Sequence, residues 1–326
     1  MVNKPLTTIN FFTPVQDLLP RVEALMLSQA DRAHAELKAA LEHLLSSGGK
    51  RIRPAVSLLT GRMFGANPDR LVTLGAAIEL LHTATLIHDD FIDGSLMRRG
   101  IATLNAQWSP AATILTGDFI FARAAKLAAE TDSVAVMRLF AETLATIVNG
   151  EITQMFTRNG IATRPEYEQR IYAKTASMFV LASGAAAILS PVDEQVIERA
   201  GSFGYEIGMA FQIVDDVLDF TSEQGTIGKP VASDLRQGLV TLPALVYQDL
   251  YPDDPDLASV LNGNRRDGGA IDRLVANIRQ SGAIQQSMEI ADSHIQRAMD
   301  ILEEMPDNPE RGALQELAGY IVQRSL

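Results

Sequence analysis

Two clusters of aspartates have the spacing that lets a helix hold a divalent cation. Each has the pattern Asp-Asp-x-x-Asp, and together they comprise Asp89, Asp90, Asp93, Asp215, Asp216 and Asp219. Because residues i and i+4 share a helix face, the first and last aspartate of each cluster would project side by side. Like charges at that spacing repel weakly, and a bound cation would offset the repulsion. Carboxylate oxygens are hard ligands, so the clusters indicate Mg²⁺ or Ca²⁺.

The residues around the clusters indicate that the aspartates are more than the solvent-exposed ends of surface helices. Residues 71–93 are nearly free of charge apart from Glu79 and the terminal aspartates, and a helix that is apolar on most sides is a buried one. One acidic helix end would more often be ordinary surface, but two of them beside apolar residues indicate two helices that face one cavity. A calcium-binding EF-hand loop needs glutamate at its twelfth position. Counting from Asp89, the twelfth residue is Gly100, so the first cluster does not have the EF-hand pattern.

A set of cations lies next to glycine, proline or the acidic clusters and comprises Lys50, Arg53, Arg98, Arg99, Lys174 and Lys229. Ordinary surface charge is the alternative for any single one. Arginine suits bidentate phosphate recognition, so the set as a whole predicts a site for two polyphosphate groups. The sequence disfavours a nucleotide-binding P-loop, because Gly49-Lys50 and Gly228-Lys229 are followed by Arg and Pro instead of Ser or Thr.

Two histidines precede the first aspartate cluster. His82 lies seven residues before Asp89, which is two helical turns back on the same face. It is either a core histidine or a phosphate contact. His88 adjoins Asp89 and permits a metal-phosphohydrolase interpretation, which needs more histidine ligands than the five scattered histidines supply.

Helices are the elements expected to position these residues. Apolar spacing predicts helices over about 14–45, 55–64, 71–93, 113–130, 132–156, 167–189, 193–220, 241–250, 283–302 and 311–324. Almost no segment alternates with period two between hairpin turns. We therefore predict an all-α fold that forms a single domain over residues 1–326.

Composition narrows the class of protein. With 47% hydrophobic residues, the 326-residue chain can bury a large core, and the absence of cysteine excludes disulfides and thiolate metal sites. A net charge of −12 disfavours a nucleic-acid partner. No run reaches 18 uninterrupted apolar residues and the N-terminal residues lack a secretory pattern. We expect no stable membrane insertion and a cytoplasmic location.

In their order along the chain, these motifs resemble the trans-type polyprenyl diphosphate synthases, a family that includes farnesyl, geranylgeranyl and longer-chain enzymes. The resemblance covers most of the chain. Its motifs are Gly48-Gly49-Lys50-Arg51-x-Arg53-Pro54, His82 with Asp89-Asp90-x-x-Asp93 and Arg98-Arg99-Gly100, Lys174-Thr175, Gln212 with Asp215-Asp216-x-x-Asp219, and Gly228-Lys229-Pro230.

The resemblance implies a bundle of long helices around a deep central cavity, the isoprenoid synthase type, usually as a homodimer. It implies three Mg²⁺ per active site, with Asp89, Asp93 and Asp215 as ligands, and catalytic roles for all six aspartates and Lys174. The implied isopentenyl diphosphate contacts are Lys50, Arg53, His82 and Arg99. The implied allylic diphosphate contacts are Arg98, Lys174, Thr175, Gln212 and Lys229. Two positions depart from the family pattern: Gly94-Ser95, where an acidic residue is usual, and Leu239, where many members have a lysine.

The implied reaction is ionisation, condensation and elimination. Metal ions neutralise the departing allylic diphosphate, an apolar cavity shelters the carbocation, the isopentenyl double bond attacks, and the released diphosphate takes the proton. A bulky aromatic at the position of Ala84 limits product length in this family. Ala84 is small, and Leu81 and Ala77 continue its helix face, so we predict a hexaprenyl to decaprenyl product for quinone side chains. The cavity floor could instead lie at Phe140 or Leu144.

Other functions remain as alternatives at this point. A geranylgeranyl or farnesyl diphosphate synthase would use the same chemistry for a shorter product. A non-catalytic subunit that binds prenyl diphosphates is less compatible with intact aspartate clusters. In a terpene cyclase, Lys50, Arg53 and His82 would have no role.

Overall fold

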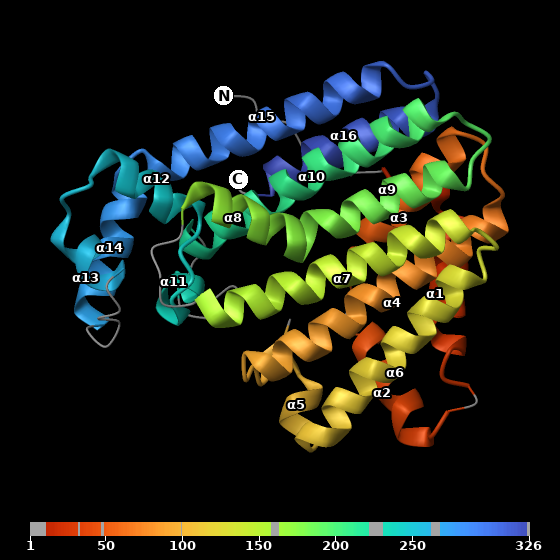
Figure 1. Ribbon diagram of the computed structural model, residues 1–326, viewed down its shortest axis with the longest axis horizontal. Helices are drawn as coiled ribbons and strands as arrows, with labels where there is room; N and C mark the ends of the chain where they lie inside the picture. Colours follow the sequence, from red (N-terminus) through yellow and green to blue (C-terminus); the bar gives the residue numbers. More distant parts are fainter. Residues whose placement is uncertain are drawn as a thin grey trace, which may run out of the picture. The chain divides into compact units, whose positions relative to one another are not determined.

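The computed structural model describes residues 11–31, 33–46, 49–98, 100–157, 163–221, 231–261 and 268–324. The predicted all-α fold is confirmed in this part of the chain (Figure 1). Its helices are η1 Thr13–Val15, α1 Leu19–Ser28, α2 Ala35–Ser46, α3 Ile52–Met63, α4 Pro68–Ile92, α5 Leu104–Gln107, α6 Pro110–Ala129, α7 Val134–Thr157, α8 Arg164–Ile171, η2 Tyr172–Ala176, α9 Ser177–Ile188, α10 Glu194–Thr221, α11 Ser233–Gln237, α12 Leu242–Leu250, α13 Pro255–Leu261, α14 Gly268–Gln280, α15 Ala283–Glu303 and α16 Pro309–Gln323.

Contacts within the chain group it into two compact units. The first unit comprises Met1–Glu142, Met178–Gly204 and Leu302–Leu317, and the second comprises Thr143–Ser177, Tyr205–Ile301 and Ala318–Leu326. Helices α7, α9, α10, α15 and α16 contribute residues to both, α9 with Ser177 alone in the second unit. The first aspartate cluster belongs to the first unit and the second cluster to the second unit. A single domain over residues 1–326 stays a prediction.

Helix α4 is the core helix of the first unit. Asn67 caps its start by accepting from the backbone N–H of Asp69 at 2.8 Å, and Pro68 occupies the first turn, where a missing N–H costs nothing. The helix packs along α6, α3 and α1 (Figure 1). Because neighbours cover it on several sides, its apolar residues are distributed all round, as predicted for a buried helix.

The structure divides the predicted N-terminal helix into shorter pieces. The apolar spacing over 14–45 continues through η1, α1 and α2, but α1 ends at Ser28 and α2 begins at Ala35. Apolar periodicity reports which residues are buried, and it persists across a short turn between two helices that pack on the same core. A turn there is therefore not visible in the pattern.

A π-helical turn, η2, joins α8 of the second unit to α9, which belongs to the first unit from Met178 on. Thr163 and Glu166 form a reciprocal capping box at the start of α8. Gly208 of α10 lies against η2 so closely that a Cβ there would be 2.5 Å from the Cα of Ala176. A single π-helical turn inside a helix is frequent at functional sites, and η2 contains Lys174 and Thr175.

Two helical runs of the described residues are long and apolar enough to cross a bilayer, Pro68–Ile92 and Arg164–Ile188. Within their apolar windows, 72% and 78% of the residues are buried inside the fold. Core helices of water-soluble proteins have the same length and composition, so these runs are weak evidence for a membrane span. The predictions of no stable membrane insertion and of a cytoplasmic location stay predictions.

Candidate active site

The first aspartate cluster lies at the C-terminal end of α4. Asp90 is only 7% exposed, and its carboxylate accepts from Nε of Arg98 at 3.0 Å to each oxygen. Nη2 of Arg98 lies 2.9 Å from the same carboxylate. Asp89 is half-buried and Asp93 is exposed. The protein therefore fixes the middle carboxylate of the cluster through a buried bidentate ion pair and leaves the two outer ones nearer to solvent.

Arg98 is held in place by a short hairpin that follows the cluster. Strand β1, Met97–Arg98, pairs antiparallel with β2, Ile101–Ala102. Gly94 ends α4 with a φ of +63°, a conformation that glycine adopts without a steric penalty. This turn gives a physical reason for glycine at a position where the family usually has an acidic residue.

His88 packs against α6. Its Nε2 lies 3.2 Å from the carbonyl oxygen of Ile114 and 3.5 Å from Oδ1 of Asp118. Gly117 leaves the space for the ring, since a Cβ there would be 2.2 Å from Nε2. Within the described ranges, no three acidic, histidine or cysteine side chains are placed to hold a metal by themselves. The metal-phosphohydrolase interpretation therefore gains no support from the geometry around His88.

The predicted isopentenyl diphosphate contacts lie in the first unit. Lys50 is exposed just before α3, and Arg53 lies in the first turn of α3 with its guanidinium 5.0 Å from the ring centroid of Phe179. His82 is half-buried on α4, which packs against α3. Arg99 lies outside the described residues.

The second aspartate cluster lies on α10, and its middle carboxylate is again buried. Asp216 is 3% exposed and accepts from the hydroxyl of Tyr167 at 2.7 Å and from Nε2 of Gln212 at 2.8 Å. Burial, with a smaller effect from the negative charge of Asp234, raises the pKa of Asp216 to about 7, although both donors act in the opposite direction. Burial also raises the pKa of Tyr167 well above 10, so its hydroxyl stays a donor.

The outer aspartates of this cluster have different surroundings. Asp219 accepts from the backbone N–H and hydroxyl of Ser233 at 3.1 and 2.9 Å, and from the backbone N–H of Asp234 at 3.1 Å. It thereby caps the start of α11. Asp215 is half-buried, and Nη1 of Arg324 lies 3.1 Å from its Oδ1. Arg324 also covers the ring of Phe211, with 4.0 Å between its Cζ and the ring centroid.

Three of the predicted allylic diphosphate contacts lie in the second unit near the π-helical turn. Nζ of Lys174 is 3.0 Å from a carboxylate oxygen of Glu151, which is mostly buried. The hydroxyl of Thr175 donates to Oε1 of Gln212 at 2.6 Å. Gln212 thus links Thr175 to Asp216. Lys229, the remaining contact predicted near this cluster, lies outside the described residues.

The carboxylate oxygens of both clusters are suitable ligands for hard divalent cations. The middle aspartates, Asp90 and Asp216, are buried and held by protein donors, whereas the other four aspartates are half-buried or exposed. Of those four, Asp89, Asp93 and Asp215 are the predicted metal ligands, and carboxylate oxygens suit Mg²⁺ and Ca²⁺. That the two clusters face one cavity stays a prediction.

Sequence reasoning missed several side chains that hold predicted site residues. Tyr167 binds Asp216, Arg324 pairs with Asp215, and Glu151 pairs with Lys174. Tyr167 lies in an ordinary helical pattern before Lys174, and Arg324 stands near the end of the chain. No local motif marked either of them.

Tyr167→Phe should destabilise the protein more at pH 8.5 than at pH 5. The pKa of Asp216 is raised from 3.8 to about 7, so the stability linked to its protonated form is present below about pH 4 and is lost as pH rises through 7. The Tyr167 hydroxyl supports the ionised carboxylate. Its removal should cost about 1.5–3 kcal/mol when Asp216 is charged and about 0.5–1.5 kcal/mol when it is neutral.

Urea unfolding at the two pH values, in chelator, measures the difference. Tyr247→Phe is the matched control, because the buried Tyr247 also donates to a carboxylate, that of Asp254, at 2.8 Å. Asp254 is only half-buried, and we expect the same penalty at both pH values. An equal penalty for Tyr167→Phe at pH 5 and pH 8.5 would contradict the assigned role of its hydroxyl.

The predicted chain-length residues, Ala77, Leu81 and Ala84, are all fully buried on α4. Of the two alternative floor residues, Phe140 is buried and Leu144 is half-buried. Burial is compatible both with a lining of the product tunnel and with ordinary helix packing. The length-determining role stays a prediction.

Comparison with known proteins assigns the family. The model of the polyprenyl synthetase family matches residues 34–278. The chain belongs to the polyprenyl synthetase family. It is 35% identical over 312 residues to heptaprenyl diphosphate synthase component 2 of Geobacillus stearothermophilus, covering 95% of this chain and 97% of that protein. It is 35% identical over 286 residues to octaprenyl diphosphate synthase of Escherichia coli K12, covering 86% and 88%.

Solved structures of polyprenyl synthases share the fold. The polyprenyl synthase of Caulobacter crescentus CB15, solved with calcium and isoprenyl diphosphate, superposes with a TM-score of 0.90 at 34% identity and covers 97% of both chains. A decaprenyl diphosphate synthase of Rhodobacter capsulatus has a TM-score of 0.90 at 31% identity, covering 97% of this chain and 98% of that one. The predicted family, the isoprenoid synthase fold and the enzyme class of this polyprenyl synthetase are confirmed.

Proposed function

We propose that this polyprenyl synthetase condenses isopentenyl diphosphate with an allylic diphosphate and releases a hexaprenyl to decaprenyl diphosphate. One observation carries the proposal. Both Asp-Asp-x-x-Asp clusters are intact, each with its middle carboxylate buried and held by protein donors, in a chain 35% identical to heptaprenyl and octaprenyl synthases. The relatives favour a long product over the geranylgeranyl and farnesyl alternatives, and intact clusters disfavour a non-catalytic subunit.

Each group of side chains has a role in the proposal. Asp89, Asp93 and Asp215 would hold Mg²⁺, three ions per site, and Asp90, Asp216 and Asp219 fix the shape of both clusters. The bound cations offset the negative charge that develops on the departing diphosphate. A divalent cation is supported by the calcium in the Caulobacter crescentus enzyme.

The cations of this chain would bind the two diphosphates. Isopentenyl diphosphate would be held by Lys50, Arg53, His82 and Arg99. The allylic diphosphate would be held by Arg98, Lys174, Thr175, Gln212 and Lys229. Lys174 can keep its contact with Glu151 while it binds a phosphate oxygen, because an ammonium group has three donors. Nε and Nη2 of Arg98 contact the carboxylate of Asp90. The guanidinium is therefore already oriented before substrate binds.

We also propose a homodimer. Val148, Ile152 and Phe156 lie four residues apart on α7, share one helix face and are exposed, Phe156 at 86%. Ile114 and Leu115 of α6 are exposed as well. Apolar side chains gathered on a helix face favour burial against another protein surface. The name of the Geobacillus stearothermophilus relative, component 2, makes a second kind of subunit the alternative partner. Light scattering after gel filtration of the purified chain distinguishes a dimer from a monomer that awaits another subunit.

The function is tested with the purified chain alone. Supplied with isopentenyl diphosphate, farnesyl diphosphate and Mg²⁺, it should form products of thirty to fifty carbons on reverse-phase separation, and chelation of the metal should reduce turnover to background. A twenty-carbon end product would contradict the long-chain proposal. Folded protein that shows no turnover would instead favour the subunit role.

A further inference from the structure

Arg51 has a backbone conformation that is unusual for a residue with a side chain. It precedes the first turn of α3 with a φ of +48° and a ψ of +35°, in the left-handed region. Non-glycine residues are disfavoured there and persist only when surrounding contacts hold them. Its carbonyl accepts from the N–H of Ala55 at 3.0 Å, so the left-handed residue is where α3 begins. Something other than local preference must fix this position.

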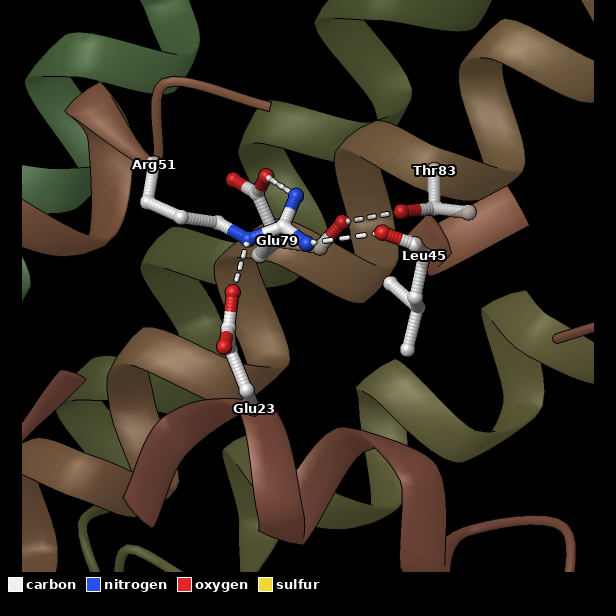
Figure 2. Close-up of polar contacts among 5 residues, drawn as sticks. All are labelled: Glu23, Leu45, Arg51, Glu79 and Thr83. Carbon is white, nitrogen blue, oxygen red and sulfur yellow. Dashed lines mark hydrogen bonds and ion pairs between the residues drawn. The ribbon is translucent and has the colours of Figure 1, made fainter. Parts of the chain in front are cut away.

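The side chain of Arg51 supplies those contacts (Figure 2). Nη1 donates to Oε1 of Glu79 at 3.1 Å, Nε to Oε1 of Glu23 at 3.0 Å, and Nη2 to the carbonyl oxygen of Leu45 at 3.3 Å. The side chains of Arg51 and Glu79 are 14% and 7% exposed, whereas that of Glu23 is 50% exposed. One guanidinium therefore joins α1, α2 and α4 to the start of α3, and its contact with Glu79 is the buried one.

Glu79 is the partner that explains the geometry. It is the only charged residue of α4 between Arg70 and the first aspartate cluster, in a helix whose neighbours are apolar. Its backbone carbonyl accepts from the hydroxyl of Thr83 at 2.8 Å (Figure 2). A buried ion pair of this kind contributes little net stability compared with apolar residues of the same size, and its best-attested use is to fix register.

The ion pair lies close in sequence to residues that are predicted to contact isopentenyl diphosphate. Lys50 directly precedes Arg51, Arg53 follows two residues later in the first turn of α3, and His82 follows Glu79 by three residues on α4. These three contacts are thus within three residues of a member of the ion pair, and the fourth predicted contact, Arg99, lies outside the described residues. The guanidinium itself is occupied by three protein acceptors.

We propose that Arg51 is a positioning residue for isopentenyl diphosphate: its buried ion pair with Glu79 fixes Lys50 and Arg53 at the start of α3 relative to His82 on α4. The proposal rests on the proposed function of these three residues. It predicts a selective effect on the isopentenyl substrate, because the predicted allylic contacts, Arg98 apart, lie in the second unit.

Single and paired substitutions separate positioning from stability. Arg51→Met leaves the Glu79 carboxylate buried without its ion pair and will lower the melting temperature. Combining Arg51→Met with Glu79→Met removes both charges together, and burial of two apolar side chains should restore the melting temperature. Arg62→Met is the matched control. Arg62 lies in the last turn of the same α3 and pairs with Asp17 at 2.7 Å, far along the helix from Lys50.

In the folded double variant, we expect the KM for isopentenyl diphosphate to rise at least tenfold while the KM for the allylic primer stays within twofold. Equilibrium binding of isopentenyl diphosphate, measured by calorimetry without turnover, should weaken by the same factor. Arg51→Lys, which keeps one charged donor, should lie between wild type and double variant. Arg62→Met should leave both KM values unchanged.

An unchanged KM for isopentenyl diphosphate in the folded double variant would overturn the proposal, and so would an equal rise for both substrates. Failure of the proposed function has a different signature: the wild-type protein itself would not bind or consume isopentenyl diphosphate.

Discussion

Replacing Asp89 or Asp215 by asparagine should lower kcat about a thousandfold without unfolding the protein. A metal-bound carboxylate supports several kcal/mol of charge stabilisation on the departing diphosphate, and each 1.36 kcal/mol corresponds to about a factor of ten in rate. Neither aspartate is a core residue, since both are half-buried. The side chains remain the same size, so the melting temperature of Asp89→Asn should change little. Asp215→Asn also removes the charge that pairs with Arg324, whose side chain is 11% exposed, and should lower the melting temperature without preventing folding.

The measurement is kcat over a range of Mg²⁺ concentrations, with the melting temperature of each variant beside it. The activation midpoint should move to higher Mg²⁺ in both variants. Asp69→Asn is the control on the same α4, at its opposite end, where the carboxylate is exposed and pairs with Arg21. Near-normal activity of Asp89→Asn and Asp215→Asn, at the Mg²⁺ concentration that saturates wild type, would remove these two residues from the metal site.

The sequence was informative wherever chemistry is encoded in local spacing. Asp89 and Asp93 are four residues apart in an apolar helix, so their shared face and the need for a cation follow from helix geometry. The same argument identified Asp215 and Asp219. It also predicted the long buried helix α4, because a segment without a polar face can only be stable when neighbours surround it.

The sequence was uninformative wherever a partner comes from a distant element. Tyr167 meets Asp216 across 49 residues, and Arg51 meets Glu79 across 28. Such pairs depend on how helices pack, and no local pattern states which buried donor will face which carboxylate. The middle aspartates looked equivalent to the outer ones in sequence. Only their burial separates Asp90 and Asp216 from the proposed metal ligands.

Small departures from regular helix could not be predicted from the sequence, because they too leave no local pattern. The hairpin of β1 and β2 has two residues in each strand, too few for a period-two pattern. The π-helical turn at Lys174 continues a helical pattern with one residue more per turn, and side-chain types do not encode that difference. Both features nonetheless position predicted diphosphate contacts, Arg98 and Lys174.

The length of the product should decrease in a graded way when bulky residues are placed along α4. Ala84 and Ala77 lie five and twelve residues before Asp89 and are both fully buried. At about 1.5 Å per residue, they are about 7.5 Å and 18 Å below the aspartate along the helix axis. If this face lines the growing chain, Ala84→Phe blocks it early and Ala77→Phe blocks it later. We expect the shortest products from Ala84→Phe, longer ones from Ala77→Phe and the longest from wild type.

Packing is the competing explanation, and it predicts a different pair of measurements. A phenylalanine forced into a filled core costs about 1–3 kcal/mol, because neighbours must leave their preferred rotamers. A cavity would receive the same ring with little loss of stability. Product length is therefore read by reverse-phase separation together with the melting temperature of each variant. Destabilised variants with unchanged products would place the floor elsewhere, at Phe140 or Leu144. Folded variants that share one product length would mean that the face carrying Ala84 and Ala77 does not measure the chain.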